Sequence, residues 1–346
     1  MAVKIALCAS MLLMVGCELT KPAAIGGDTQ IIVFCDSAQW QLSRETLAAI
    51  FERTIKTPQP ETEFYLQRVD ISLFDVYKKY KNLMFIGDLS SEKEVSATVR
   101  SMLNTDARQA VQEGHVVFSR NDEWARGQLV LVLVSPDPAT MNTRLQNGAE
   151  EMFQLVDEHC LASLSQFLYS TSAPLEDKSL PQSLRTKYGW SLRVHPDFEL
   201  ISEVPDSHYV RFHSNSQIQS LQRWISIHWT SLDSTQDPES ILTTEWMHRT
   251  RSWIGGRFVD PVQTVPMYDR IRPADFAGRN ALRYDGVWKT VSIQHAFGGA
   301  FRSYGFFDAS RRSVFFIDLA VFFPEETNKL KYLRELDAIA RTFTTD

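Results

Sequence analysis

Two patterns of apolar residues divide this sequence, and they constrain its fold more than any other feature. In the first half, apolar runs typical of buried strands, such as residues 31–35 and 129–134, alternate with segments of helical spacing, such as residues 43–58 and 141–168. Strands that alternate with helices favour an α/β layer structure. We therefore expect residues 30–170 to form an α/β domain.

The second half carries short strand patterns that follow one another closely. They lie at residues 188–194, 199–204, 209–212, 223–229, 283–289, 301–307 and 313–323, with helices predicted over 238–253 and 328–342. This order predicts an α+β domain with a mainly antiparallel sheet packed by helices, an α/β sandwich, over residues 182–346. Within it, the Asp285–Gly286 pair predicts a tight turn between Tyr284 and Trp288. The polar, proline-containing residues 170–181 mark the predicted boundary.

The N-terminus has the form of a bacterial lipoprotein signal. Lys4 precedes an apolar run over residues 5–15, and Gly16 stands before Cys17. The run is too short to span a bilayer, which takes about 20 residues. We expect residues 1–16 to be a signal peptide, Cys17 to carry acyl chains such as palmitate, and residues 17–29 to be a tether. An ordinary secretory signal or a buried helix is the alternative.

The net charge and the cysteine content limit which ligands and cofactors the chain could bind. The 346-residue chain has a formal net charge of −6, which disfavours nucleic acid because such binding depends on phosphate neutralisation. Besides Cys8 and Cys17, the sequence has Cys35 and Cys160, which either pair or are buried free thiols. The sequence has no CxxC and no Cys/His zinc spacing, so we expect no metal and no cofactor.

Linear motifs of catalysis are absent. The sequence contains no GxSxG, HExxH or Walker motif. Ser90–Lys93 matches SxxK, and Glu245–His248 is one ExxH, but a helix start and an exposed helical pair explain them more simply. We expect no catalytic residue, although a hydrolase whose site is assembled only in space is a second interpretation.

Two groups of side chains are candidates for binding. Trp124, Arg126 and Gln128 alternate before a predicted strand and would share one face of it, unless Trp124 packs an edge and Gln128 bonds to backbone. The second group is cationic and lies near Gly255–Gly256 and Gly298–Gly299; its members are Arg249, Arg251, Trp253, Arg257, Arg302 and Tyr304. Arginine suits carboxylate or phosphate, and glycine lets a backbone approach a ligand. Arginines that only offset a helix dipole are the alternative.

The sequence also resembles a known lipoprotein family, domain of unknown function 4837, over nearly the whole mature chain. The resemblance rests on the lipoprotein signal and on residues 122–128, 285–288, 297–301 and 332–336. Residues 188–196 and the final helix are similar to the PsbP/Mog1-like sandwich. The first resemblance implies location and topology but no activity. Proteins of the second fold act mainly as adaptors or assembly factors.

Together these features predict a cell-envelope protein held to a membrane by an N-terminal lipid, at the outer membrane and facing the periplasm or the cell surface. We expect its body to bind an anionic ligand or an envelope protein partner without catalysis. A groove lined by Arg251, Trp253 and Arg302 would favour this function. A pocket with clustered carboxylates and histidines would favour a hydrolase, and a large exposed apolar patch would favour a subunit of an envelope assembly.

Overall fold

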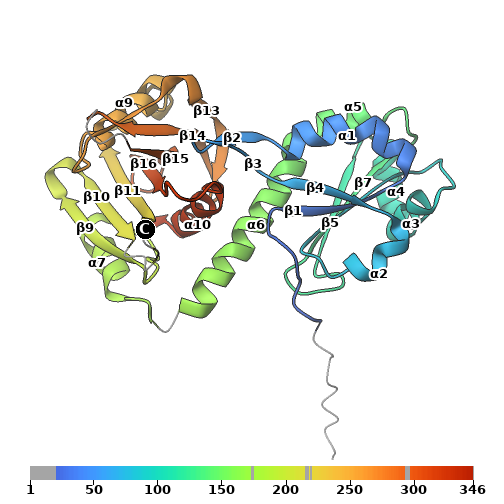
Figure 1. Cartoon of the computed structure of the whole chain (residues 1–346). Helices are drawn as coiled ribbons and strands as arrows, with labels where there is room; N and C mark the ends of the chain where they lie inside the picture. The colour runs from blue at the N-terminus through green and yellow to red at the C-terminus, as the bar shows by residue number, and fades with distance from the viewer. Residues whose placement is uncertain (1–20, 173–174, 215–217, 219, 293–296, 346) are drawn as a thin grey trace, which may run out of the picture.

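The computed structural model describes residues 21–172, 175–214, 218, 220–292 and 297–345, and it has two halves, each built on its own sheet (Figure 1). The predicted fold class is confirmed: an α/β half is followed by an α+β half with a mainly antiparallel sheet. The predicted signal peptide and Cys17 lie outside the described residues. Among the helices that are described, none has the length and apolar character needed to cross a membrane.

The N-terminal half has a five-stranded sheet in the order β4-β1-β5-β7-β6. Four strands are parallel and β6 is antiparallel. The strands are β1 (Gln30–Cys35), β4 (Tyr65–Val69), β5 (Asn82–Asp88), β6 (Val117–Asn121) and β7 (Leu129–Ser135). β1, β5 and β7 are almost wholly buried, which is why their sequences read as continuous apolar runs.

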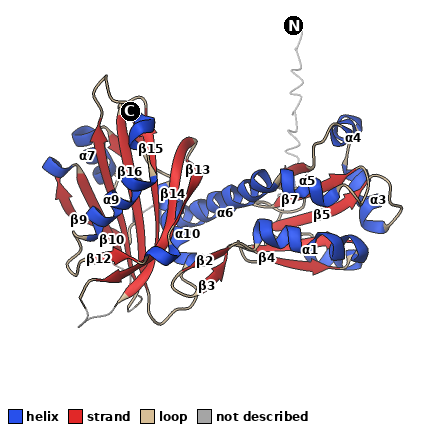
Figure 2. Cartoon of the chain, turned by 90° about the horizontal axis from the view of Figure 1, so that it is seen from above, coloured by secondary structure: helices blue, strands red, loops and turns tan. Residues whose placement is uncertain are grey.

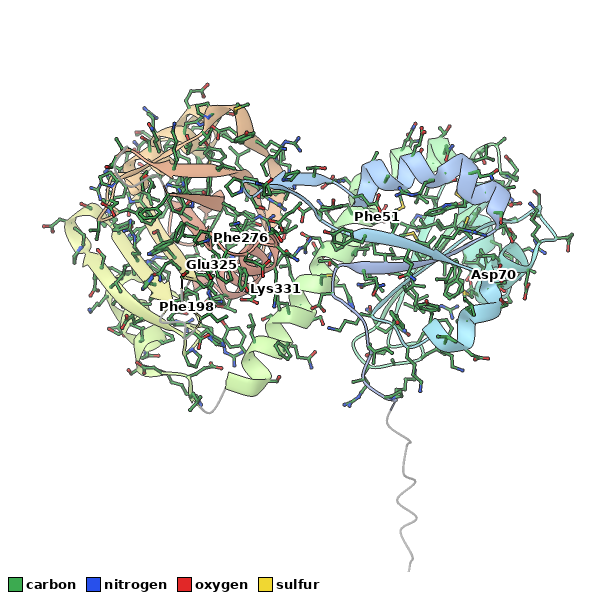
Figure 3. The ribbon with its side chains drawn as sticks, viewed as in Figure 1. Phe51, Asp70, Phe198, Phe276, Glu325 and Lys331 are labelled. Atoms are coloured by element: carbon green, nitrogen blue, oxygen red, sulfur yellow. The ribbon has the colours of Figure 1, made fainter. Side chains whose placement is uncertain are left out.

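Helices cover both faces of this sheet. One face packs against α1 (Ser37–Phe51), α5 (Met141–Asn147) and α6 (Ala149–Ser172). The other packs against α3 (Glu94–Met102) and α4 (Thr105–Gln112), with α2 (Phe74–Tyr77) beside them. Phe51 lies within this half in Figure 3 and is fully buried.

The C-terminal half has an eight-stranded sheet in the order β12-β14-β15-β16-β11-β10-β9, with β13 also paired to β14. Its strand pairs are antiparallel throughout the residues that the structure describes. The strands are β9 (Phe198–Val204), β10 (Tyr209–Ser214), β11 (Gln222–Ser231), β12 (Val262–Thr264), β13 (Arg270–Phe276), β14 (Arg279–Thr290), β15 (Gly298–Asp308) and β16 (Ser313–Phe322). A two-stranded sheet joins β8 (Trp190–Ser191) to β17 (Thr344–Thr345).

Each face of the eight-stranded sheet has its own apolar core. α10 (Leu330–Ala340) packs on one face with Leu333 and Leu336 of the predicted apolar stripe, and Phe276 belongs to this core (Figure 3). α9 (Thr244–Gly255) packs on the other face through Met247 and Ile254. α7 (Ser179–Tyr188) and α8 (Pro238–Ile241) complete the helices of this half that the structure describes.

Two elements connect the halves. α6 extends from the N-terminal half toward the C-terminal half (Figure 2). The second, which we call the arm, is the hairpin of β2 (Thr54–Lys56) and β3 (Pro60–Thr62) together with Glu63, the next residue. The arm reaches from the first sheet toward β14 (Figure 1). The Glu61 carboxylate at its end accepts hydrogen bonds from the backbone N–H groups of Lys329 and Leu330 at 2.9 and 3.0 Å, and so caps α10.

Several expectations need correction. Asp285–Gly286 lies inside β14 rather than at a turn, because both flanking strands pair with residues on either side of it. The helix expected over 141–168 is broken at Gly148, and the helix expected over 238–253 is broken between Ile241 and Thr244. The described part of the expected tether, residues 21–29, lies against the N-terminal half, where the Ala24 N–H donates to the Arg126 carbonyl.

Candidate functional site

The arm places Glu63 among buried arginines of the C-terminal half. The Arg283 guanidinium donates to Glu63 Oε1 at 3.0 Å, and Arg334 donates to Oε2 at 2.7 Å. Arg302 Nη2 lies 3.5 Å from Oε1. All four side chains are 5% exposed or less, so this ion-pair group is shielded from water. A carboxylate of one half therefore neutralises cations of the other.

The ion pairs continue into the C-terminal half. Asp285 accepts from Arg283 Nε at 2.6 Å and from Arg302 Nε at 2.7 Å. Arg302 Nη1 also donates to Asp337 at 2.9 Å, where the Tyr304 hydroxyl donates at 2.7 Å. On the N-terminal side, Arg334 donates to Asp157 of α6 at 2.8 Å. We call these residues the charge network; they are Glu63, Asp157, Arg283, Asp285, Arg302, Tyr304, Arg334 and Asp337.

The arginines keep the acids of the charge network ionised. Burial disfavours the charged form of Glu63, but Arg334, Arg283 and Arg302 outweigh burial and hold its pKa below the ordinary value. Burial also opposes ionisation of Asp285 and Asp337, and the adjacent arginines lower the pKa of both carboxyls. These groups are therefore fixed anions at neutral pH, unsuited to exchange protons in catalysis.

A cavity of about 480 Å³ lies between the arm and the C-terminal half, beside the charge network. Residues from the end of α1, the arm, β13 and β14 form its walls. They are Ala49, Arg53, Thr54, Ile55, Lys56, Glu63, Met267, Tyr268, Asp269, Arg270, Arg272, Asp285 and Gly286. We call this the inter-half cavity, and its size matches small-molecule sites, which occupy about 300–1,000 Å³.

Arg272 is a half-buried cation of this cavity with only a distant ion-pair partner. Its nearest ion-pair partner, Asp285 Oδ2, lies 4.0 Å away and already accepts from Arg283 at 2.6 Å. Burial and then repulsion from Arg283 lower the pKa of Arg272. Arg270 and Lys56 add two exposed cations, of which Arg270 donates to the Thr54 carbonyl at 3.3 Å. An anion in the cavity would relieve the poor pairing of Arg272.

Asp269 is the acid in the cavity walls that the charge network does not use. Its Oδ2 lies 3.6 Å from His248 Nδ1, and that nitrogen is 3.0 Å from the Tyr284 hydroxyl. Burial raises the pKa of Asp269. His248 is the histidine of the ExxH pattern, which was predicted to be an exposed helical pair. In the structure it contacts Asp269 and Tyr284.

The cationic group predicted from the sequence does not form a groove. Arg302 and Tyr304 are fully buried in the charge network, and Arg251 is 1% exposed, where its Nε lies 2.8 Å from Asp318. Arg251, Trp253 and Arg302 therefore do not line an open groove, the arrangement that would have favoured the binding function. These buried guanidinium groups lie against carboxylates, which for Arg302 include Glu63 of the other half.

The remaining members of that group lie on α9 and just after it. Arg249 and Arg257 are exposed, and the Arg257 guanidinium stacks on the Trp253 ring at 3.2 Å. Arg257 also donates to the Trp253 carbonyl at 3.2 Å. These contacts correspond to the alternative in which arginines satisfy the end of a helix, and a ligand-binding role for them stays a prediction.

Trp124, Arg126 and Gln128 lie in the connection between β6 and β7 and do not share a strand face. Trp124 packs edge-on against Phe74 with ring centroids 5.1 Å apart. Gln128 is buried and donates to the carbonyls of Lys78 and Tyr80 at 2.8 and 2.7 Å. Arg126 donates to the Lys21 carbonyl at 3.0 Å. This geometry corresponds to the alternative in which Trp124 packs against other side chains and Gln128 bonds to backbone. Ligand binding by these residues stays a prediction.

Cys35 and Cys160 are both free and buried. Burial raises the pKa of each thiol to about 12, so both are protonated and unreactive at neutral pH. The open question of a disulfide is thus settled in favour of buried thiols. In the part of the chain that the structure describes, no group of three or more His, Cys, Asp or Glu side chains could hold a metal ion.

Sequence reasoning missed the residues of the inter-half cavity and of the charge network, above all Glu63, Arg272 and Arg334. One signal was available: Arg283 and Asp285 are charged residues two positions apart, so they share a face if the segment is one continuous strand. Charges on a buried face need partners. The partner Glu63 is 220 residues from Arg283 in the sequence, which no local pattern reveals.

Comparison with known families divides the chain at the same place as its two sheets. Residues 177–342 match the domain of unknown function DUF4837, and residues 24–168 match a second domain of unknown function, DUF8532. The resemblance to DUF4837 is confirmed, but it covers the C-terminal half rather than nearly the whole mature chain. A search of curated proteins found no match.

Similarity to solved structures is weak. LpqN, involved in cell envelope biogenesis of Mycobacterium tuberculosis, is 15% identical with a TM-score of 0.31; the match covers 45% of this chain and 83% of LpqN. The Saccharomyces cerevisiae Ran-binding protein Mog1p is 11% identical with a TM-score of 0.30, over 45% of this chain and 90% of Mog1p. At these TM-scores the similarity supports no conclusion about this chain.

Proposed function

We propose that this chain is a lipid-anchored cell-envelope protein whose two halves bind an anionic ligand between them, without catalysis. The observation that carries the binding role is the inter-half cavity, where Arg272 has no close carboxylate of its own. Lys56 and Arg270 extend the positive charge to the rim. A carboxylate or phosphate would pair with these groups, since arginine binds both with charge-assisted hydrogen bonds.

The carboxylates in the cavity support binding over hydrolysis. Glu63 and Asp285 accept from buried arginines, so neither is free to act as a general acid or base. The hydrolase alternative would rest on Asp269, whose raised pKa and contact with His248 suit proton transfer. Asp269 lies in the same cavity, and a hydrolase would therefore cleave the ligand that Arg272 binds.

Calorimetric titration of the protein with citrate and with inorganic phosphate tests the binding site. Replacing Arg272 with Gln should weaken anion binding at least tenfold, because a hydrogen bond to a charged group contributes about 1.5–3 kcal/mol. Arg257→Gln is the matched control, since Arg257 is exposed and lies outside the cavity. Absence of anion binding, or equal binding by the Arg272→Gln variant, would contradict the proposal.

Membrane attachment is tested separately. Two or more acyl chains hold a protein on a bilayer almost permanently, since each buried methylene contributes about 0.8 kcal/mol. Cys17→Ala should therefore move the protein from the membrane fraction to the soluble fraction, and intact-mass spectrometry of the unaltered protein should show fatty acyl mass at its N-terminus. A Cys17→Ala protein that still sediments with membranes would rule out the anchor.

A further inference from the structure

A second cavity, of about 200 Å³, lies at one end of the eight-stranded sheet and shares no residue with the inter-half cavity. Aromatic and aliphatic side chains from β9, β11, β12, β14 and β16 form most of its wall. The aromatic members are Trp224, Phe258, Trp288, Phe297 and Phe322. We call this the aromatic pocket. Its size is below that of sites for drug-sized molecules, so it suits a single ring or a short chain.

One buried cation, Arg211 of β10, lines the aromatic pocket. Its side chain stacks on the Phe258 ring at 3.9 Å, and the whole residue is 5% exposed. Arg211 donates only to neutral groups: to the Arg257 carbonyl at 3.0 Å, to the Ile254 carbonyl at 3.3 Å and to the Ser226 hydroxyl at 3.3 Å. These bonds use three of its five N–H groups, and Tyr209 also hydrogen-bonds to the guanidinium.

Arg211 has no carboxylate counter-ion among the described residues, although its side chain is buried. Among the described residues, no carboxylate oxygen lies within ion-pair distance of it, and the nearby Asp318 pairs with Arg251 instead. Asp260 is the acid of the pocket wall, and it is exposed at the rim. Burial lowers the pKa of Arg211, which shows the cost of this unpaired charge. Buried charges are usually paired, because the desolvation cost of an isolated ion is several kcal/mol.

We propose that the aromatic pocket binds a small amphiphilic carboxylate, with its apolar body between Trp224 and Phe322 and its carboxylate on Arg211. The aromatic wall supplies apolar contact, and the Arg211 guanidinium supplies charge-assisted bonds to the carboxylate. Charge complementarity selects an anion over a neutral compound of the same shape. This site is independent of the inter-half cavity and of the function proposed for it.

Tryptophan fluorescence provides the test, because Trp224 and Trp288 are both in the pocket wall. Octanoate and phenylacetate should change the emission in a saturable way. Octanol, which has the same chain without the charge, should bind at least tenfold more weakly than octanoate. This comparison uses the unaltered protein, so it does not depend on how well an Arg211 variant folds. Equal affinity for octanol and octanoate would overturn the role of Arg211, and no saturable change would overturn the site.

Variants at the rim locate the bound anion. Ile201 is 48% exposed on the edge strand β9 and lines the pocket, so Ile201→Glu adds a negative charge at the mouth without altering the core. Octanoate should then bind at least fivefold more weakly, while circular dichroism stays unchanged. Arg272→Gln, in the other cavity, should leave octanoate binding as it was. Octanoate binding that is unaffected by Ile201→Glu, or that is lost in Arg272→Gln, would contradict the proposal.

Discussion

Glu63 is one carboxylate that three arginines share. Arg283 and Arg334 donate to its two oxygens, and Arg302 lies within 3.5 Å, with all of these groups shielded from solvent. A buried ion pair contributes little compared with an apolar replacement of both partners, but removal of one partner leaves the other charges uncompensated. Removing the negative charge of Glu63 should therefore lower the stability of the folded protein substantially.

Replacing Glu63 with Gln should lower the free energy of unfolding by about 3–5 kcal/mol, because three buried guanidinium groups lose their shared anion. Urea denaturation followed by circular dichroism measures this change. Glu45→Gln on the exposed side of α1 is the control, and a surface change of this kind should stay within about 0.5 kcal/mol. Equal stabilities for the two variants would show that the charge network is not coupled as the distances indicate.

At the scale of elements, the pairing of β14 with β15 depends on glycines opposite aromatic rings. Gly286 pairs with Phe301, and a Cβ on Gly286 would lie 2.7 Å from that ring. Gly299 pairs with Trp288, and a Cβ there would overlap the Val321 carbonyl and lie 2.8 Å from the indole. Gly299 therefore makes room for a packed ring, whereas the sequence analysis had considered it a place where a ligand approaches the backbone.

Gly299→Ala should destabilise the protein by about 1–3 kcal/mol, since the added methyl group forces the Trp288 ring and the β16 backbone apart. Thermal unfolding monitored by tryptophan fluorescence should show a lower midpoint. Gly256→Ala, at the end of α9, is the matched control, because its Cβ would meet its nearest neighbour at an ordinary 3.7 Å. An unchanged midpoint for Gly299→Ala would mean that β14 and β15 pack less closely than described.

At the scale of the whole molecule, ion pairs and caps join the two halves. Glu63 of the arm and Asp157 of α6 both pair with Arg334 of α10, and Glu61 caps the same helix. Neither half satisfies its buried charges alone. We therefore expect both halves to unfold together at neutral pH, in one calorimetric transition.

Acid should weaken this connection. The folded-state pKa values of Glu63, Asp285 and Asp337 are lowered, so their contribution is complete above the unfolded values of about 4 and is lost as pH falls toward the folded ones. Burial raises the pKa of Glu61 and Asp318, so protonation of these two groups favours the folded state and opposes this loss of stability.

Comparison with a variant isolates the effect. Urea unfolding at pH 7, 5 and 3.5 should show a smaller loss of stability on acidification for Glu63→Gln than for the unaltered protein. A loss of the same size in both proteins would show that Glu63 is not an ionised partner of the arginines.

The sequence by itself determined the features that depend on local periodicity. Apolar runs predicted β1, β5 and β7, and the spacing of Leu333 and Leu336 predicted the buried side of α10, because burial of one face imposes a repeat on neighbouring residues. The two classes of sheet followed from the order of these elements. The lipoprotein signal and Cys17 can also be recognised from the sequence alone, and the lipid anchor remains a prediction.

Only the tertiary structure decided which charges meet. Glu63 and Arg334 are 271 residues apart, and Arg302, which the sequence offered as a candidate for ligand binding, is buried in the charge network. The sequence around a charged residue is the same whether its side chain is hydrated by water or paired with a distant residue. The pairing and the inter-half cavity depend on how the halves pack. The aromatic pocket depends on how the strands of the C-terminal half come together, and no motif indicates either cavity.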